Sequence, residues 1–193
     1  MKMEAFEDGY CDPVQTLSLV PHPDGPPSAV SEIEVQIWAV AERRLHLRYI
    51  ATGDMARVVW PDNVSPERTD GLWKHSCFEA FRRTGNGPAY QEYNFSPSTA
   101  WAAYDFAAYR KGGKDLLLVE RPQIWIDTGH DWLALEVEVA APALAAPWQF
   151  NLTAVIEETG GHKSYWALKH GDGAPDFHDP ACFLFEVGAP LAA

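Results

Sequence analysis

Hydrophobic and polar residues alternate along much of the chain, and turn-forming residues separate the alternating segments. Residues 30–40, VSEIEVQIWAV, place Ile33, Val35 and Ile37 on one side and charged or amide side chains on the other. Residues 44–51, RLHLRYIA, alternate in the same way after a short Glu-Arg break. A period of two predicts half-buried strands, and the short break predicts an antiparallel hairpin.

Turn segments such as TGNGP and SPS separate the remaining strand candidates. These candidates are residues 57–60, 72–82, 89–95, 101–106, 117–127, 132–140, 148–157, 164–168 and 182–187. Only residues 106–111 and 141–146 have helical composition, which allows one or two short helical turns. The pattern predicts an all-β fold, an antiparallel two-sheet β-sandwich of about eleven strands. We expect one domain over residues 1–193, with a frayed tail at 188–193.

Composition is consistent with one hydrophobic core that needs no disulfides. The chain has 193 residues, of which 47% are hydrophobic. Cys11, Cys77 and Cys182 are far apart and have no metal-binding spacing, which favours a reducing compartment. The first residues lack the apolar stretch of a secretory signal, and no run reaches the roughly 18 apolar residues of a membrane helix. These observations predict a cytoplasmic location.

The chain is strongly acidic. Twenty-seven Asp and Glu residues against fifteen Lys and Arg residues give a formal net charge of −12. This charge repels phosphate backbones and anionic lipid surfaces, so neither nucleic acid nor membrane is an expected partner.

Residues 70–106 combine aromatic and polar side chains at a density that ordinary core strands do not need. Alternation places Glu79 on the same side as Trp73 and His75, and assigns Phe78 to the core. In the next strand it assigns Gln91, Tyr93 and Phe95 to the core and leaves Tyr90, Glu92 and Asn94 on the other face. The segment predicts a face that binds a ligand.

Five segments together resemble the DOMON-like superfamily of β-sandwiches, which includes family 9 carbohydrate-binding modules. They are WKHSCFEAF (73–81), YQEYNFSPS (90–98), WLALEVEVAAPAL (132–144), WQFNLTAVIE (148–157) and SYWALKHGDGAPDFHDPACFLFEV (164–187). The resemblance covers residues 30–187. It implies a domain that binds a sugar or haem. Members are mostly extracytoplasmic, and the absence of a visible signal segment departs from that pattern.

A sugar site needs aromatic rings for the apolar faces of the sugar and polar groups for its hydroxyls. We therefore expect a small polar ligand, with a sugar favoured, and a non-catalytic role. The expected ligand-binding residues are Trp73, Lys74, His75, Glu79, Tyr90, Glu92, Asn94, Trp101, Tyr104, Trp166, Lys169 and His178.

Two alternatives stay open. Haem b binding, implied by the resemblance, has Met55 and His170 as candidate axial ligands. A protein-interaction or enzyme-associated domain is the other alternative. No cofactor is required, although a structural calcium ion fits the superfamily. His and Asp residues gather within 162–179, but their spacing matches no metal motif.

Catalysis lacks a convincing set of residues. Alternate side chains on one face of a strand lie ~7 Å apart, so Cys77 is too far from His75 for a direct hydrogen bond within that strand. A buried structural thiol is the expectation for Cys77. The oligomeric state is left open.

Overall fold

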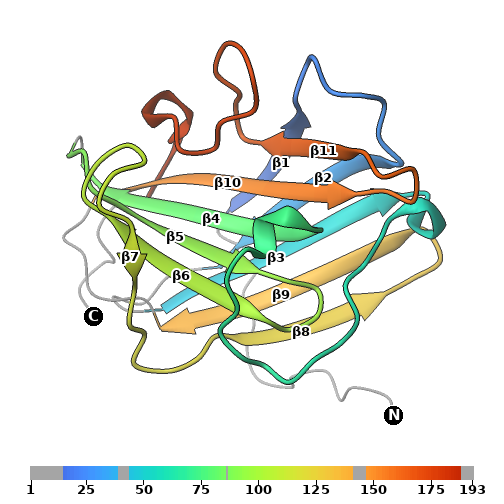
Figure 1. Ribbon diagram of the computed structural model, residues 1–193, viewed down its shortest axis with the longest axis horizontal. Coiled ribbons are helices and arrows are strands. Elements are labelled where there is room, and N and C mark those ends of the chain that lie inside the picture. Colours follow the sequence, from blue (N-terminus) through green and yellow to red (C-terminus); the bar gives the residue numbers. More distant parts are fainter. Residues whose placement is uncertain (1–14, 39–43, 86, 141–146, 188–193) are drawn as a thin grey trace.

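The computed structural model describes residues 15–38, 44–85, 87–140 and 147–187 (Figure 1). These residues form a 12-stranded antiparallel sheet and three short 3-10 turns. The strands are β1 (Gln15–Pro21), β2 (Val30–Ile37), β3 (Arg44–Gly53), β4 (Cys77–Thr84), β5 (Tyr90–Phe95), β6 (Trp101–Phe106), β7 (Lys114–Asp115), β8 (Gln123–Thr128), β9 (Trp132–Ala140), β10 (Trp148–Glu157), β11 (Lys163–Ala167) and β12 (Phe185–Val187). The turns are η1 (Met55–Arg57), η2 (Leu72–Lys74) and η3 (Pro180–Cys182).

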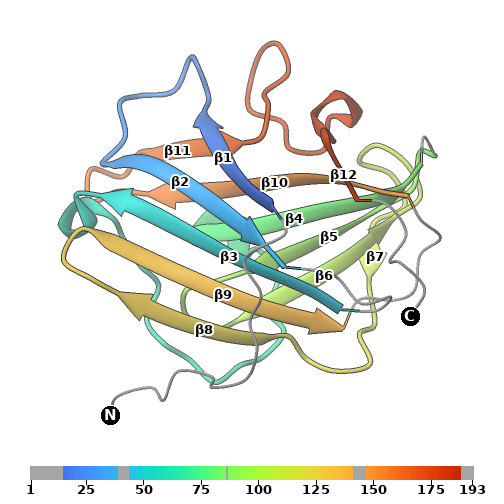
Figure 2. The same cartoon turned by 180° about the vertical axis from the view of Figure 1, so that it is seen from behind.

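Hydrogen bonds join the strands into one curled sheet with the order β7-β6-β5-β4-β10-β11-β1-β2-β3-β9-β8, and β12 pairs with β10. The sheet turns at β1. Residues Gln15–Leu19 of β1 pair with β2, and Val20 and Pro21 pair with β11. The half that contains β4, β5, β6 and β10 therefore faces the half that contains β2, β3, β8 and β9, as the two opposite views show (Figures 1 and 2).

The main hydrophobic core fills the space between these two halves. It includes Val35 and Leu47 from one half and Phe78 and Tyr93 from the other, all fully buried. Tyr49 on β3 joins the halves directly: its ring lies 5.1 Å from that of Phe78, and its hydroxyl donates a 2.8 Å hydrogen bond to the Glu79 carbonyl. Burial of these side chains is the main stabilising contribution of the core.

The outer faces of the two halves differ in character. The β3–β9 side carries partly exposed ion pairs, such as His46–Glu136 at 2.7 Å and Arg44–Glu138. The β4–β5–β10 side is covered instead. Glu79 and Thr153, which point away from the main core, expose only 2% and 0% of their surface. Other segments of the chain must cover this second face, because polar side chains on a sheet face that is open to solvent stay exposed.

The all-β, antiparallel class is confirmed, but the division into two separate sheets is not. Continuous pairing through β1 makes one sheet. Alternation did not predict β1, because only one of its seven residues is buried, nor the two-residue β7.

Three local predictions are wrong in whole or in part. The strand predicted at 117–127 is shorter, because β8 begins only at Gln123. Residues 57–60 form no strand, since η1 occupies Met55–Arg57 and Val58 makes only an isolated bridge to Glu158. Residues 106–111 contain the end of β6 and a turn rather than a helix. The helical turn predicted at 141–146 and the tail at 188–193 lie outside the described residues.

Within the described ranges, no helix is long and apolar enough to cross a membrane. Cytoplasmic location and a single domain over the whole chain stay predictions.

Candidate functional site

A cavity of about 440 Å³ lies against the covered outer face of β4, β5, β6, β10 and β11. Its volume lies within the usual range for small-molecule sites. The described residues that line it are Trp73, Glu79, Phe81, Glu92, Tyr104, Phe106, Arg110, Val155, Tyr165, Pro175, Phe177 and His178. Aromatic rings and ionisable groups thus share one enclosure.

The floor of the cavity follows from strand register. On β4, Glu79 and Phe81 project to the outer face while Phe78 and Ala80 enter the main core. Phe81 is paired with Glu92 of β5. Glu92 is in turn paired with Tyr104 of β6. Facing pairs share one side of a sheet, so these residues form a continuous strip across three strands.

One wall of the cavity is formed by Trp73 from η2. The turn starts at Gly71, whose φ of 79° lies in the left-handed region that glycine adopts without strain. The Trp73 ring meets the Tyr104 ring edge to face, with 6.0 Å between centroids. Tyr104 is held in place by a 2.7 Å hydrogen bond from its hydroxyl to Asp70. Trp73 is 43% exposed, so its ring is accessible to a ligand.

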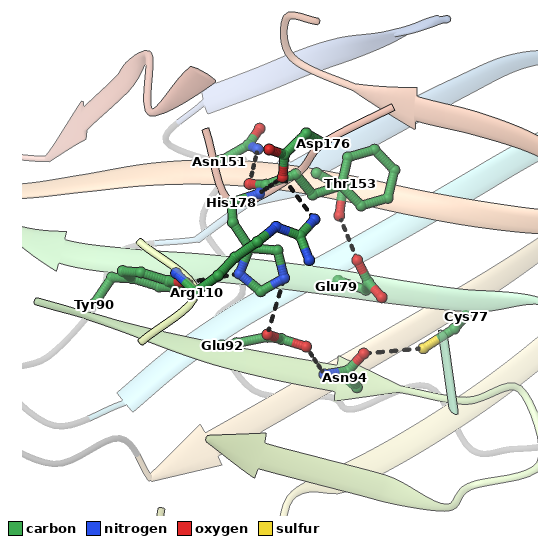
Figure 3. Close-up of polar contacts among 11 residues, drawn as sticks. Cys77, Glu79, Tyr90, Glu92, Asn94, Arg110, Asn151, Thr153, Asp176 and His178 are labelled. Carbon is green, nitrogen blue, oxygen red and sulfur yellow. Dashed lines mark hydrogen bonds and ion pairs between the residues drawn. The ribbon is translucent and has the colours of Figure 1, made fainter. Parts of the chain in front are cut away.

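The cover over the sheet comes from the loop before η3 and from the turn after β6. Asp176 links them: it accepts a 2.8 Å hydrogen bond from Arg110 and a 3.1 Å bond from the His178 backbone (Figure 3). Asn151 of β10 donates a 3.0 Å bond to the Phe177 carbonyl. These contacts fix the cover to the sheet below. Although burial opposes it, hydrogen bonds from Tyr109 and Arg110 hold the pKa of Asp176 below its ordinary value.

His178 is a neutral side chain at the edge of the cavity. Burial, reinforced by the charge of Arg110, lowers the pKa of His178 to about 4. The Tyr90 hydroxyl lies 2.7 Å from Nδ1 and also accepts a 3.2 Å bond from the Arg110 backbone N–H. The Tyr90 hydroxyl can therefore donate its proton to Nδ1 of His178. Nδ1 then acts as the acceptor, and the imidazole carries its own proton on Nε2. Nε2 faces Glu92 Oε2 at 3.8 Å (Figure 3).

Two buried carboxyl groups lie on the floor. Burial and the nearby Glu92 raise the pKa of Glu79, against a hydrogen bond from Thr153. Burial also raises the pKa of Glu92, against a 2.7 Å hydrogen bond from Asn94 and the charge of Arg110. Removal from water disfavours the charged form of each group. Near neutral pH the floor therefore holds protons that exposed carboxyl groups would have lost.

Five of the residues expected to bind a ligand line this cavity: Trp73, Glu79, Glu92, Tyr104 and His178. Tyr90 and Asn94 lie directly behind it, bonded to His178 and Glu92. The assignment of Phe78, Tyr93 and Phe95 to the core is confirmed. A ligand-binding role for the lining residues stays a prediction.

The remaining expected residues do not line the cavity. Trp166 is only 2% exposed and belongs to the main core, and its indole N–H donates to Ser164. It therefore presents no ring surface to a ligand in this structure. Trp101 also packs against the core. Lys74 and Lys169 are exposed side chains outside the lining.

His75 is placed differently from the prediction. Alternation was extended back to Trp73, but β4 begins at Cys77 and η2 ends at Lys74, so a period of two does not apply there. His75 is exposed and lies 2.8 Å from Glu157.

Sequence reasoning missed several lining residues. Phe81 and Phe106 follow from the alternation that placed Glu79 and Tyr104, so a signal for them was present. Arg110, Pro175 and Phe177 come from turns and loops, where no periodicity indicates which side chains point inward.

The cofactor alternatives gain no support from the geometry. Met55 packs against the main core, and His170 bonds the Val20 carbonyl at 2.9 Å, so neither is among the described residues that line the cavity. Within the described part of the chain, no group of three or more His, Cys, Asp or Glu side chains is arranged to hold a metal ion. Cys77 is buried, and burial raises the pKa of its thiol well above the ordinary value. This supports the expectation of a structural thiol.

The sequence matches no protein-family model and no curated protein. Its fold is similar to solved structures. A candidate carbohydrate-binding protein from Bacteroides uniformis has a TM-score of 0.59 and 16% identity, over 88% of this chain and 84% of that one. A family 9 carbohydrate-binding module from Caldicellulosiruptor kristjanssonii, in complex with cellotriose, has a TM-score of 0.46 and 12% identity, over 81% and 77% of the two chains. The likeness to the Bacteroides protein shows a shared fold. Membership of the DOMON-like superfamily stays a prediction.

Proposed function

We propose that this chain is a non-catalytic domain that binds a carbohydrate or a sugar-derived small molecule in the cavity beside Trp73. The observation that carries the proposal is the lining itself. An accessible indole ring stands at the wall, and two carboxyl groups and a guanidinium lie within the same enclosure of about 440 Å³.

The lining matches the two kinds of surface that a sugar presents. The C–H face of a pyranose packs on a flat ring, which Trp73 and Tyr104 can supply. Its hydroxyl groups need acceptors and donors, which Glu79, Glu92 and Arg110 can supply. A mainly apolar ligand would leave one oxygen of each carboxyl group without a hydrogen-bond partner, at a cost in affinity.

The thiol near these carboxyl groups does not favour catalysis. The Cys77 thiol is kept protonated by burial and so is a poor nucleophile.

The structural neighbour agrees with this proposal. The Bacteroides uniformis protein that shares the fold is described as a candidate carbohydrate-binding protein. The resemblance suggests a similar role. The proposed ligand-binding residues come from the cavity of this chain.

Isothermal titration calorimetry with a panel of mono- and disaccharides tests the proposal. We expect at least one neutral or amino sugar to bind with a dissociation constant in the millimolar range or below. Trp73→Ala is expected to weaken that binding about tenfold or more. Trp125→Ala, the same change on β8 in the other half of the sheet, is the matched control and is expected to leave binding intact. Saturable binding that Trp73→Ala does not weaken, or no binding across the panel, would overturn the proposal.

A further inference from the structure

The cavity is lined by more carboxyl groups than permanently charged basic groups. The lining contains two carboxyl groups, Glu79 and Glu92, one guanidinium, Arg110, and one imidazole, His178. Burial raises the pKa of the lining Tyr104 well above its ordinary value, so its hydroxyl adds no charge near neutral pH.

Neither basic group is committed to the carboxyl pair, although the charge of Arg110 reaches Glu92 and opposes the rise of its pKa. Arg110 forms a 2.8 Å ion pair with Asp176, whose pKa is lowered so that it stays charged. His178 is neutral near pH 7, because burial lowers its pKa to about 4. Among the described residues, the contact of His178 Nε2 with Glu92 at 3.8 Å is the one approach of a basic group within 4.0 Å of either carboxyl.

Each carboxyl group has one oxygen engaged and one available. Thr153 donates to Glu79 Oε2 at 2.9 Å, and Asn94 donates to Glu92 Oε1 at 2.7 Å. Within the described ranges, Glu79 Oε1 and Glu92 Oε2 accept no hydrogen bond from the protein. Both side chains project to the same side of neighbouring strands (Figure 3). Further hydrogen-bond partners for these two oxygens must come from water or a ligand.

The register places the two carboxyl groups side by side on one face of adjacent strands. Glu79 is paired with Asn94, so Glu92 is its diagonal neighbour on β5. Diagonal neighbours lie roughly 7–8 Å apart at their α-carbons. A protonated amine offers three N–H donors, enough for both free oxygens, and one positive charge, which balances one of the two carboxylates.

We infer that the cavity selects a ligand that carries a protonated amine, of the amino-sugar class, and holds its ammonium group between Glu79 and Glu92. The inference rests on the proposed function and goes beyond it by naming the charge of the ligand. Trp73 and Tyr104 would contact the ring of the sugar, and Glu79 and Glu92 would bind its ammonium group.

Proton release accompanies such binding. In the free protein, burial and mutual repulsion favour the protonated form of the carboxyl pair. An ammonium group favours the ionised form, so its arrival expels protons and the affinity rises with pH until the amine itself loses its proton. A neutral sugar has no such effect. Of the other groups that face the pair, Arg110 and Asp176 keep their charge and His178 stays neutral over this range.

Calorimetry with three hexoses that differ only at one carbon tests the inference: D-glucosamine, D-glucose and N-acetyl-D-glucosamine. We expect D-glucosamine to bind about tenfold or more tightly than either neutral sugar. Titrations in two buffers of different ionisation enthalpy should show net proton release for D-glucosamine alone. Glu79→Gln and Glu92→Gln should each reduce the preference, and Glu136→Gln on β9 is the matched control that should retain it.

The outcomes separate this inference from the proposed function. If D-glucose or N-acetyl-D-glucosamine binds as tightly as D-glucosamine, in a Trp73-dependent manner, the amine inference is overturned and sugar binding stands. If none of the three binds, and the wider panel also fails, both are overturned. The proton count is measured on the unaltered protein, so it decides the question even if a glutamine variant does not fold.

Discussion

The hydroxyl of Thr153 on β10 donates a 2.9 Å hydrogen bond to Oε2 of Glu79 on the adjacent strand β4. Both side chains are buried on the outer face of the sheet, and Glu79 lines the floor of the cavity. The bond lowers the pKa of Glu79 and so opposes burial, which raises it. Thr153 therefore controls how readily this carboxyl group ionises.

Thr153→Val removes this hydrogen bond at nearly constant volume. We expect the pKa of Glu79 to rise further, because its charged form loses a donor. Carbon-13 NMR titration of the glutamate side-chain carboxyl signals measures the change. Thr16→Val, at an exposed position on β1, is the matched control. An unchanged or lowered Glu79 pKa in Thr153→Val would contradict the role given to this bond.

The carboxyl pair makes stability depend on pH in an unusual direction. The pKa is raised from 4.5 to about 8 for Glu79 and to about 7 for Glu92, so the folded state holds more protons than the unfolded state over this range. Stability is then greatest below the ordinary carboxyl pKa and is lost as pH rises through the raised values. His178 acts oppositely, but only between its lowered pKa of about 4 and its ordinary value of 6.5.

The window above pH 6.5 lies outside the range in which His178 acts. We expect the free energy of unfolding to fall by about 1 kcal/mol or more between about pH 6.5 and 8.5. Urea denaturation at the two pH values measures it. The double change Glu79→Gln and Glu92→Gln should flatten the dependence. Stability that is constant or rises across this window in the unaltered protein would refute the assignment.

Tyr49→Phe tests the contact between the two halves of the sheet. The Tyr49 hydroxyl donates a 2.8 Å hydrogen bond to the Glu79 carbonyl in a fully buried setting. Its loss should reduce the free energy of unfolding by about 1 to 2 kcal/mol. Tyr109→Phe removes an exposed hydroxyl bonded to Asp176 and should cost less than about 0.5 kcal/mol. Equal costs for the two changes would count against the bridging role of Tyr49.

Trp73 and Trp166 were both predicted to bind a ligand, but their replacement by alanine should have different costs in stability. Trp73 is 43% exposed at the cavity wall, so Trp73→Ala should weaken sugar binding with a stability cost of about 1 kcal/mol or less. Trp166 lies in the main core, so Trp166→Ala should cost about 3 to 5 kcal/mol. Thermal denaturation followed by circular dichroism measures both. The reverse order of costs would show that their placement is wrong.

Much of the fold follows from local pattern. Alternation placed Phe78, Tyr93 and Phe95 in the core and Glu79 and Glu92 on the opposite face, because a strand has a fixed period of two. The curl of the sheet through β1 did not follow. That strand buries little apolar surface, and its position is set by pairing with β2 and with the distant strand β11 rather than by its own residues.

The site was predictable only where it lies on strands. Trp73 was predicted to bind a ligand because it is an aromatic residue next to polar ones. Trp166 was predicted on the same grounds, but it is buried in the core. Arg110 and Phe177 reach the cavity through turns that Asp176 fastens together. Such contacts join residues far apart in sequence, and no periodic pattern encodes them.

The central claim is that the cavity beside Trp73 holds a sugar. Diffraction from crystals soaked in the sugar that binds most tightly in solution tests it most directly. We expect electron density for the sugar in this cavity, with its ring against Trp73 and a polar group within hydrogen-bond distance of Glu79 or Glu92. Density for the sugar elsewhere on the protein, with this cavity empty, would contradict it.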